Sequence, residues 1–330
     1  MTDQQSPSLN HIKFHFQTSN IYSKSISSMS LIQFQFIILG TNDGLLNMLS
    51  LKPPYSSFEY IFSNLKAHQN YIHSISENLS DKNILITSDP SNIKIWFFNT
   101  QLKTLIKLKS ISPTTTTQLN HLFSIYNNHF ITTSWDNIIS IWNLEYLYRE
   151  HYTFKANGKI TSIIQLHKRT KDFSEKENEI IIYGCLEPKQ HIAFLDIKKY
   201  VQIPKSINGI CPTHKGGLLE ISNEHVAVVS KGELAIYIVD VIKCTKVKEI
   251  KHTSFEYYHS KELSLLELSL NKLLYVYENE MCIIDTNSYE IIQQETVEKN
   301  SGMKVGVIKC NQFLICDNST IQGLNVYLLE

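Results

Sequence analysis

Apolar and polar residues alternate through much of the chain, and the clearest stretch is 130–144, FITTSWDNIISIWNL. β-branched residues occupy every second position on both sides of the pair Asp136-Asn137. Alternation with a period of two places successive side chains on opposite faces of a β-strand, and Asp and Asn are common in tight turns. The stretch therefore predicts a β-hairpin with Asp136 and Asn137 in its turn.

The same hairpin pattern returns along the chain at nearly regular intervals. In the best copies a turn residue stands six positions before a large apolar residue, as Asp136 stands before Trp142 and Asp43 before Leu49. The large apolar residues of the repeat are Leu49, Trp96, Trp142, Leu195, Tyr237, Ile284 and Tyr327. Successive members are 42–53 positions apart, close to the period of about 40–45 residues that is expected of four-stranded propeller blades. Seven such residues predict seven blades.

The hairpin resembles that of WD40 repeats, which carry an Asp in the turn and a Trp six residues later. WD40 repeats also carry a His ahead of their first strand, four and seven residues before two buried apolar positions. His68, His214 and His259 have this spacing. The resemblance implies a seven-bladed, all-β propeller in which these three histidines are structural.

The resemblance further implies that each such His belongs to a hydrogen-bond network with a strand Ser or Thr, the turn Asp and the Trp indole of its blade. Trp96, Asp136 and Trp142 are the other expected structural residues. We expect no repeat to keep the whole set, because Pro90 takes the place of Asp in the second repeat and Gln118 takes the place of His in the third. Apolar packing between blades should then supply most of the stability.

The domain organisation predicted from these patterns is a single propeller over residues 9–330, preceded by a disordered tail at 1–8. Residues 10–17 alternate as a half-buried strand, and we expect this strand to complete the last blade and close the ring. Residues 167–179, HKRTKDFSEKENE, interrupt the fourth repeat, and we expect them to form an exposed loop.

Composition limits the cellular compartments and the classes of partner that fit this chain. Lys plus Arg and Asp plus Glu both number 31, which argues against a broad nucleic-acid or membrane surface. The 6 cysteines form no CxxC pair, which favours a reducing compartment. Residues 1–10 lack a signal-peptide pattern, and the apolar run 31–39 is far shorter than the roughly 20 residues that span a bilayer. We expect a protein of the cytoplasm or nucleus with no membrane span.

Motifs for catalysis, metals and phosphates are missing: the sequence contains no HExxH, no phosphate-binding glycine loop and no Gly-x-Ser-x-Gly. Cys211 and His214 have a CxxH spacing, but zinc needs four converging ligands and no second pair stands at a fixed spacing. We therefore expect no metal, no cofactor and no enzymatic activity. A hydrolase at the mouth of the channel is an alternative that would need converging carboxylates or histidines there.

A binding surface is implied by the resemblance. In WD40 blades the residue just before the turn Asp faces the rim of the central channel on the top face. Here that residue is Trp135, and the same register places Asn42, Asp89 and Tyr277 at the rim. A Trp is large and amphipathic and is suited to be a binding anchor. The alternative is that Trp135 packs against a loop of a neighbouring blade.

A second candidate surface is a stripe of lysines at positions 243, 246, 248 and 251. These residues could simply be the solvated side of an outer strand, or they could bind a lipid headgroup, a nucleic acid or an acidic partner. We favour a non-catalytic scaffold or adaptor subunit of an intracellular multiprotein complex, which binds a partner peptide or loop on its top face. The lipid- or nucleic-acid-binding propeller is the alternative.

Overall fold

The structure is a computed structural model of the chain. It describes residues 12–18, 26–33, 35–52, 57–113, 117–125, 128–145, 149–166, 180–186, 189–210, 212, 217–222, 224–230, 235–251, 263–268, 271–277, 280–296, 304–309, 312–316 and 324–329. The predicted tail at 1–8 and the charged loop at 167–179 lie outside these residues. Every regular element among the described residues is a β-strand. These residues contain no helix that is long and apolar enough to cross a membrane.

Strands β2 to β25 form six four-stranded antiparallel sheets, in which the strands lie side by side in chain order. The first sheet has β2 (Ile26–Ile32), β3 (Phe36–Thr41), β4 (Leu45–Lys52) and β5 (Ser57–Lys66). The second has β6 (Ser74–Glu77), β7 (Ile84–Ser88), β8 (Ile93–Asn99) and β9 (Thr104–Ile111). The third has β10 (Leu119–Ile125), β11 (His129–Ser134), β12 (Ile138–Asn143) and β13 (Arg149–Lys155).

The next three sheets follow the same plan. The fourth has β14 (Ile160–Gln165), β15 (Ile180–Cys185), β16 (His191–Asp196) and β17 (Val201–Asn208). The fifth has β18 (Leu218–Glu220), β19 (His225–Val229), β20 (Ala235–Asp240) and β21 (Thr245–Lys251). The sixth has β22 (Leu263–Leu268), β23 (Lys272–Tyr277), β24 (Glu280–Asp285) and β25 (Glu290–Thr296).

The remaining strands come from both ends of the chain. They are β1 (Ile12–Thr18), β26 (Lys304–Lys309), β27 (Gln312–Cys316) and β28 (Leu324–Leu329). Their order is β1-β28-β27-β26, so that the first strand of the chain pairs antiparallel with the last.

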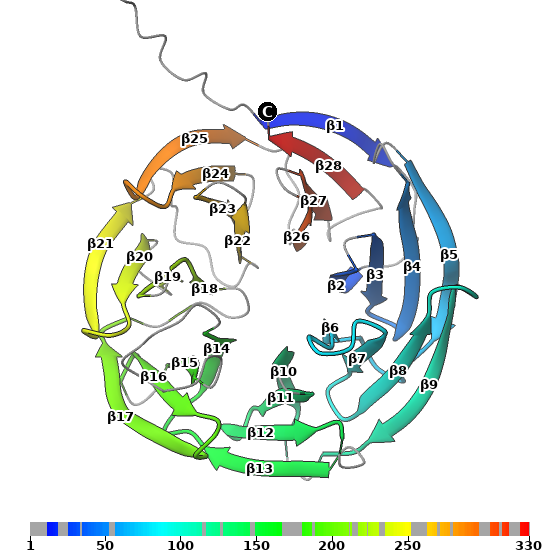
Figure 1. The fold of residues 1–330 in the computed structure, drawn as a ribbon, viewed down its shortest axis with the longest axis horizontal. Helices are drawn as coiled ribbons and strands as arrows, with labels where there is room; N and C mark the ends of the chain where they lie inside the picture. Colours follow the sequence, from blue (N-terminus) through cyan, green and yellow to red (C-terminus); the bar gives the residue numbers. More distant parts are fainter. Residues whose placement is uncertain are drawn as a thin grey trace, which may run out of the picture.

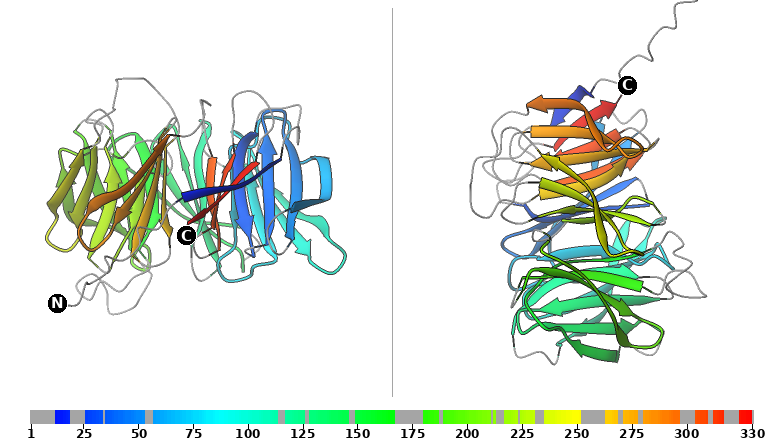
Figure 2. Two further views of the ribbon diagram at one scale, coloured as in Figure 1. Left: turned by 90° about the horizontal axis from the view of Figure 1, so that it is seen from above. Right: turned by 90° about the vertical axis from the view of Figure 1, so that its left-hand side faces the viewer.

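The sheets stand side by side around a central axis (Figure 1). The first strand of each chain-ordered sheet lies nearest the axis, and the fourth lies on the outside (Figure 1). Seen from the side, the molecule is flattened, and its strands run between two faces (Figure 2). The prediction of an all-β architecture built from four-stranded antiparallel sheets is confirmed.

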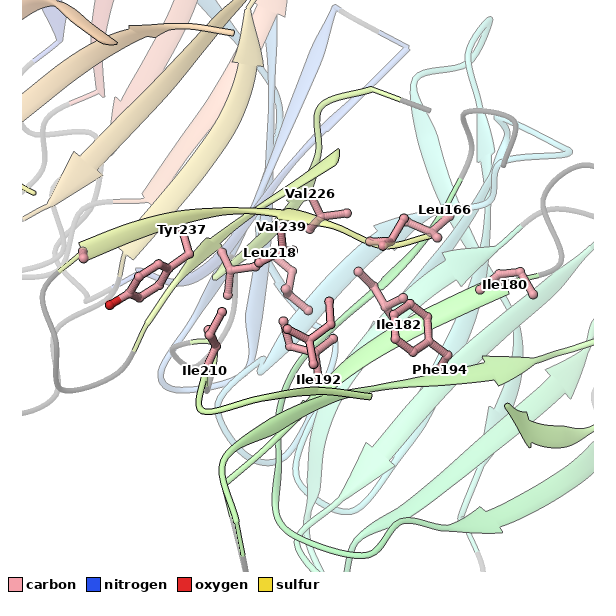
Figure 3. Close-up of a cluster of buried hydrophobic side chains, with 14 residues drawn as sticks. Leu166, Ile180, Ile182, Ile192, Phe194, Ile210, Leu218, Val226, Tyr237 and Val239 are labelled. Atoms are coloured by element: carbon pink, nitrogen blue, oxygen red, sulfur yellow. The ribbon is translucent and has the colours of Figure 1, made fainter. Parts of the chain in front are cut away.

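The core lies between neighbouring sheets, because each sheet packs a face against the next one. One cluster joins the fourth and fifth sheets, where Ile182 and Phe194 lie opposite Leu218 and Val239 (Figure 3). Burying one such side chain contributes about 1.5–3 kcal/mol. The middle strands β15 and β20 are covered on both faces and are apolar almost throughout, and all of their residues are buried.

Candidate binding face and its hydrogen-bond network

The β3–β4 and β11–β12 hairpins have the same turn, formed by Thr41 to Gly44 in one and Ser134 to Asn137 in the other. In each, the hydroxyl of the first residue donates to the Asp two positions later. The N–H of the fourth residue donates to the carbonyl of the first, over 3.0 Å at Gly44 and 3.1 Å at Asn137. Both fourth residues have a left-handed backbone, with φ of 80° and 67°. Gly and Asn tolerate this conformation best, so the sequence suits the turn.

Both turns pack against the segment that connects the fourth strand of their sheet to the next sheet. The carbonyl of Gly44 accepts hydrogen bonds from the N–H groups of Ala67 and His68, both over 3.0 Å. The carbonyl of Asn137 accepts one from Ala156 over 2.8 Å. The turns and these connecting segments form one face of the molecule, which we call the top face.

Trp135 lies in the exposed corner of its turn. Its side chain is 55% exposed, while its backbone N–H donates to the carbonyl of Gln118 over 3.0 Å. The ammonium of Lys159, on the segment between β13 and β14, lies 4.2 Å from the centre of the indole ring. A cation over a Trp ring is an attractive contact. The backbone and one ring face of Trp135 are thus fixed by neighbours, and about half of its side chain faces solvent.

Asn42 occupies the position in the first sheet that Trp135 occupies in the third, and it too is exposed. The structure therefore places two of the four predicted rim residues in equivalent exposed turns. Tyr277 is the last residue of β23, and its side chain lies outside the part that the structure describes.

Asp89 does not line the rim, and its placement from the sequence is corrected by the structure. Its side chain is only 1% exposed and points to His68. The reason is the length of the turn: residues 89–92 separate the paired Ser88 and Ile93, whereas 134–138 separate the equivalent pair in the third sheet. Asp89 was assigned by counting seven positions back from Trp96, as Trp135 stands seven before Trp142. Because the turn is one residue shorter, this count is wrong by one position, and Asp89 is the structural equivalent of Ser134.

A buried network runs through the second sheet from Trp96 to Asp89. The Trp96 indole N–H donates to Thr87 Oγ1 over 2.8 Å, and Thr87 Oγ1 lies 2.7 Å from His68 Nε2. His68 Nδ1 lies 3.3 Å from Asp89 Oδ2. Because the carboxylate of Asp89 can only accept, the proton of the neutral imidazole resides on Nδ1, facing Asp89. Nε2 then accepts, and the Thr87 hydroxyl donates to it. The expectation that no repeat keeps the whole set was wrong, since Asp89 supplies the carboxylate that we sought at Pro90.

The charge of Asp89 is compensated inside the protein. Burial by itself would raise the pKa of Asp89, but the hydrogen bond from His68 opposes it. The N–H groups of Ser91 and Asn92 also donate to its Oδ1, over 2.8 and 2.6 Å. Together these donors hold the pKa well below that of an ordinary Asp.

The third sheet holds part of the same network. The Trp142 indole N–H donates to Thr132 Oγ1 over 2.8 Å. Asp136 accepts from Ser134 in the turn, and its own backbone N–H donates to Thr117 Oγ1 over 3.0 Å. The two other predicted structural histidines, His214 and His259, lie outside the described residues.

Asp residues have a second role, at the ends of the third strands, which the sequence patterns did not predict. Asp196, Asp240 and Asp285 each accept hydrogen bonds from the N–H groups two and three positions later. Such Asx turns are a common way to end a strand, and an Asp directly after an apolar run was the available signal. They lie at the opposite face from Trp135.

Glu224, His225 and Asp240 bring possible metal-ligating atoms within 4.8 Å of one another at this opposite face. Asp240 is already committed, because its Oδ1 caps the turn and its Oδ2 lies 3.2 Å from the Lys243 ammonium. His225 Nδ1 lies 2.8 Å from the Tyr289 hydroxyl of the next sheet. A cation here would have to displace the ammonium, so the trio is better explained as part of the turn.

Comparison with known proteins gives a match at the level of structure. The chain matches no family model and no curated protein sequence. It is similar to the crystal structure of the WD40 β-propeller domain of Doa1, with a TM-score of 0.71 and 14% sequence identity over 97% of both chains. An identity this low establishes the fold and leaves the activity open. The chain thus has the fold of a WD40 β-propeller.

Proposed function

We propose that this protein is a non-catalytic scaffold or adaptor subunit of a multiprotein complex of the cytoplasm or nucleus, and that it holds a peptide or loop of a partner on its top face. The observation that carries the proposal is the state of Trp135. Trp96 and Trp142 are 4% and 3% exposed and belong to the core, whereas Trp135 is 55% exposed on a turn that its neighbours fix. A pre-organised aromatic side chain is typical of the anchor of a binding site.

The rigidity of this face would come from a closed ring of seven blades, with β1 completing the last one. The pairing of β1 with β28 supports this arrangement. So do the contacts of the innermost strands, which join β2 to β6, β10, β14, β18, β22 and β26 in succession and then β26 back to β2. In a closed ring the first and last sheets also pack against each other, so no long sheet edge is exposed where the chain begins and ends.

The surroundings of Trp135 favour contact with an electron-rich or acidic group of the partner. Lys159 covers one part of the ring, so a carboxylate placed beside Trp135 would meet the ammonium and the edge of the indole together. Asn42 offers an amide in the equivalent turn of the first sheet, where it could hydrogen-bond the backbone of an extended peptide.

The lysine stripe is less suited to be the primary site, because three of its four members already have partners. Lys243 lies 3.2 Å from Asp240, and Lys251 lies 3.5 Å from Glu249. The Lys246 ammonium lies 4.2 Å from the centre of the Tyr237 ring. A lipid or nucleic acid would have to compete with these contacts.

The experiment is quantitative affinity capture with the tagged chain, comparing wild type with Trp135→Ala. We expect the captured partner to fall by about tenfold in the variant, as for a binding hot spot. The thermal midpoint should change little, because the indole contributes little to the core. The control is Val201→Ala on β17, whose side chain is similarly exposed at 49% but lies on an outer strand. Equal capture by Trp135→Ala and wild type would remove the proposal.

A further inference from the structure

Large apolar side chains that remain exposed are concentrated on one outer strand of the described residues. Leu102 in the β8–β9 turn is 70% exposed, and Ile106 and Leu108 on β9 are 49% and 45% exposed. Other outer strands of the described part show at most one such side chain each: Tyr60 on β5, Val201 on β17 and Val247 on β21. Single exposed apolar residues are ordinary, but a group of three on one edge marks a candidate interaction site.

The charges around this group are positive. Lys107 and Lys109 stand on either side of Leu108, and both are exposed. In the described part neither has an ion pair or hydrogen bond to an acid. Burial lowers the pKa of the nearby Lys94, and the positive charge of Lys107 lowers it further. The acid of the adjoining outer strand, Glu59, is engaged by Lys103 at 3.7 Å.

We propose that Leu102, Ile106 and Leu108, with Lys107 and Lys109, form a second docking surface, the β9 strip, which binds an acidic amphipathic segment of a partner protein. Charge complementarity selects this partner: its apolar residues would cover the exposed leucines and isoleucine, and its carboxylates would face the two lysines. At about 3.3 Å per residue, β9 from Thr104 to Lys109 extends for roughly 20 Å, with Leu102 in the turn before it, which suits a short linear segment.

A second copy of this chain fits the strip poorly. A two-fold interface would place the same patch on both sides and bring Lys107 and Lys109 toward the lysines of the other copy. Like charges that face each other across paired surfaces are destabilising. The strip also lies on the outside of the ring (Figure 1), so that it and the top face can be occupied independently.

The fold provides a matched control on β21. Leu108 lies in a β-bulge between the pairs Trp96–Lys107 and Ile95–Lys109. Val247 lies in the equivalent bulge of the fifth sheet, between the pairs Val239–Lys246 and Ile238–Lys248. Both bulge residues are thus exposed apolar residues flanked by two lysines. What β21 lacks is the apolar neighbour, because Thr245 stands where β9 has Ile106.

The test is selection from a random dodecapeptide library displayed on phage, with the intact chain as the target. Peptides that bind wild type are then measured by fluorescence anisotropy against Leu108→Glu, Ile106→Glu and Val247→Glu. We expect selected peptides that combine apolar with acidic residues. Their affinity should fall by about tenfold or more for Leu108→Glu and Ile106→Glu, and by less than about twofold for Val247→Glu. All three variants should keep the wild-type thermal midpoint within a few degrees, since these side chains lie at the surface.

The proposal would be overturned if the selection yielded no peptide whose affinity falls in Leu108→Glu, or if the selected peptides lacked acidic residues. It would also be overturned if Val247→Glu lost as much affinity as Leu108→Glu. Sedimentation of wild type as a dimer that Leu108→Glu dissociates would assign the strip to self-association instead. Peptides of the β9 strip should bind Trp135→Ala as well as wild type, so failure here and failure of the top-face site are distinguishable.

Discussion

At the scale of single residues, the buried carboxylate of Asp89 shows how this protein keeps a charge in its interior. A buried charge without partners is strongly unfavourable. Here His68 and the N–H groups of Ser91 and Asn92 surround the carboxylate, and the same His continues to Thr87 and Trp96. The network ties the connecting segment before β6 to the β7–β8 hairpin, and it therefore fixes the top face of the second sheet.

The pH dependence of stability should reveal Asp89. Its pKa in the folded protein lies below the unfolded value of about 3.9, so its stabilisation is present above that value and is lost as the pH falls toward the folded pKa. We expect the free energy of unfolding of wild type to exceed that of Asp89→Asn at pH 7, and the difference to shrink between about pH 4 and pH 2. Urea unfolding at a series of pH values measures it. A difference that is constant with pH would contradict this role of the charge, and Glu290→Gln, at an exposed position, is the control.

Thr87 should contribute more to the stability of the protein than Thr132, its counterpart in the third sheet. Thr87→Val leaves both the Trp96 indole N–H and His68 Nε2 without their partner, whereas Thr132→Val leaves only the Trp142 indole. Each buried group left unpaired costs about 1–3 kcal/mol. We expect Thr87→Val to lower the free energy of unfolding by more than Thr132→Val, by about 1 kcal/mol or more. Equal losses in urea unfolding would show that the His68 contact contributes nothing.

The sequence was sufficient for residues whose spacing is independent of the turn. His68 was found by its distances to Ile72 and Ile75, and Trp96 was found by its place in the repeated hairpin. The structure joins the two through Thr87. Asp89 was assigned to the rim because the β7–β8 turn is one residue shorter than the β11–β12 turn. A fixed count back from the Trp cannot detect such a difference. The exposed group on β9 also went unnoticed, since alternation alone does not tell an outer strand from an inner one.

At the scale of elements, the hairpin turns and the connecting segments form one unit. Gly44 lies where this unit is tightest, because a Cβ atom there would come within 2.3 Å of the His68 carbonyl oxygen. Gly209 has a similar left-handed backbone, with φ of 76° against 80° for Gly44, but no atom lies within 4 Å of its Cβ position. Substitution of Gly209 therefore measures the cost of backbone strain alone, whereas substitution of Gly44 adds the cost of the close contact.

The paired substitutions test this packing. Gly209→Ala should cost about 1 kcal/mol, the strain of a left-handed residue with a Cβ. Gly44→Ala should cost about 2–4 kcal/mol, because the connecting segment must also move away from the turn. The measurement is the free energy of unfolding in urea. If the two variants lose the same stability, the turn does not pack tightly on residues 67–70.

Strands were the elements that the sequence predicted best. Alternation revealed hairpins such as 130–144, and the repeat of their large apolar residues revealed the four-stranded plan. Middle strands such as β15 do not alternate, because both of their faces are buried, so alternation alone could not reveal them. Asx turns at Asp196 and Asp240 depend on local hydrogen bonds and became visible only in the structure.

At the scale of the whole molecule, the account depends on a ring that is closed by the two ends of the chain. The top face can present Trp135 and Asn42 in fixed positions only if the sheets cannot spread apart. Neighbouring sheets share apolar clusters, so opening the ring at one seam would expose core side chains to water. Closure by β1 and β28 is therefore the central claim.

Disulfide trapping of the closing strands tests this claim most directly. Gln17 and Asn325 are cross-strand partners of β1 and β28. Paired residues of antiparallel strands have Cα atoms about 4.5–5.5 Å apart, which a disulfide can bridge. In Gln17→Cys/Asn325→Cys we expect oxidation to join the two positions within one molecule, as identified by mass spectrometry of the tryptic peptides, and to raise the thermal midpoint. A double variant that forms no such link, or that links only between molecules, would contradict the closed ring.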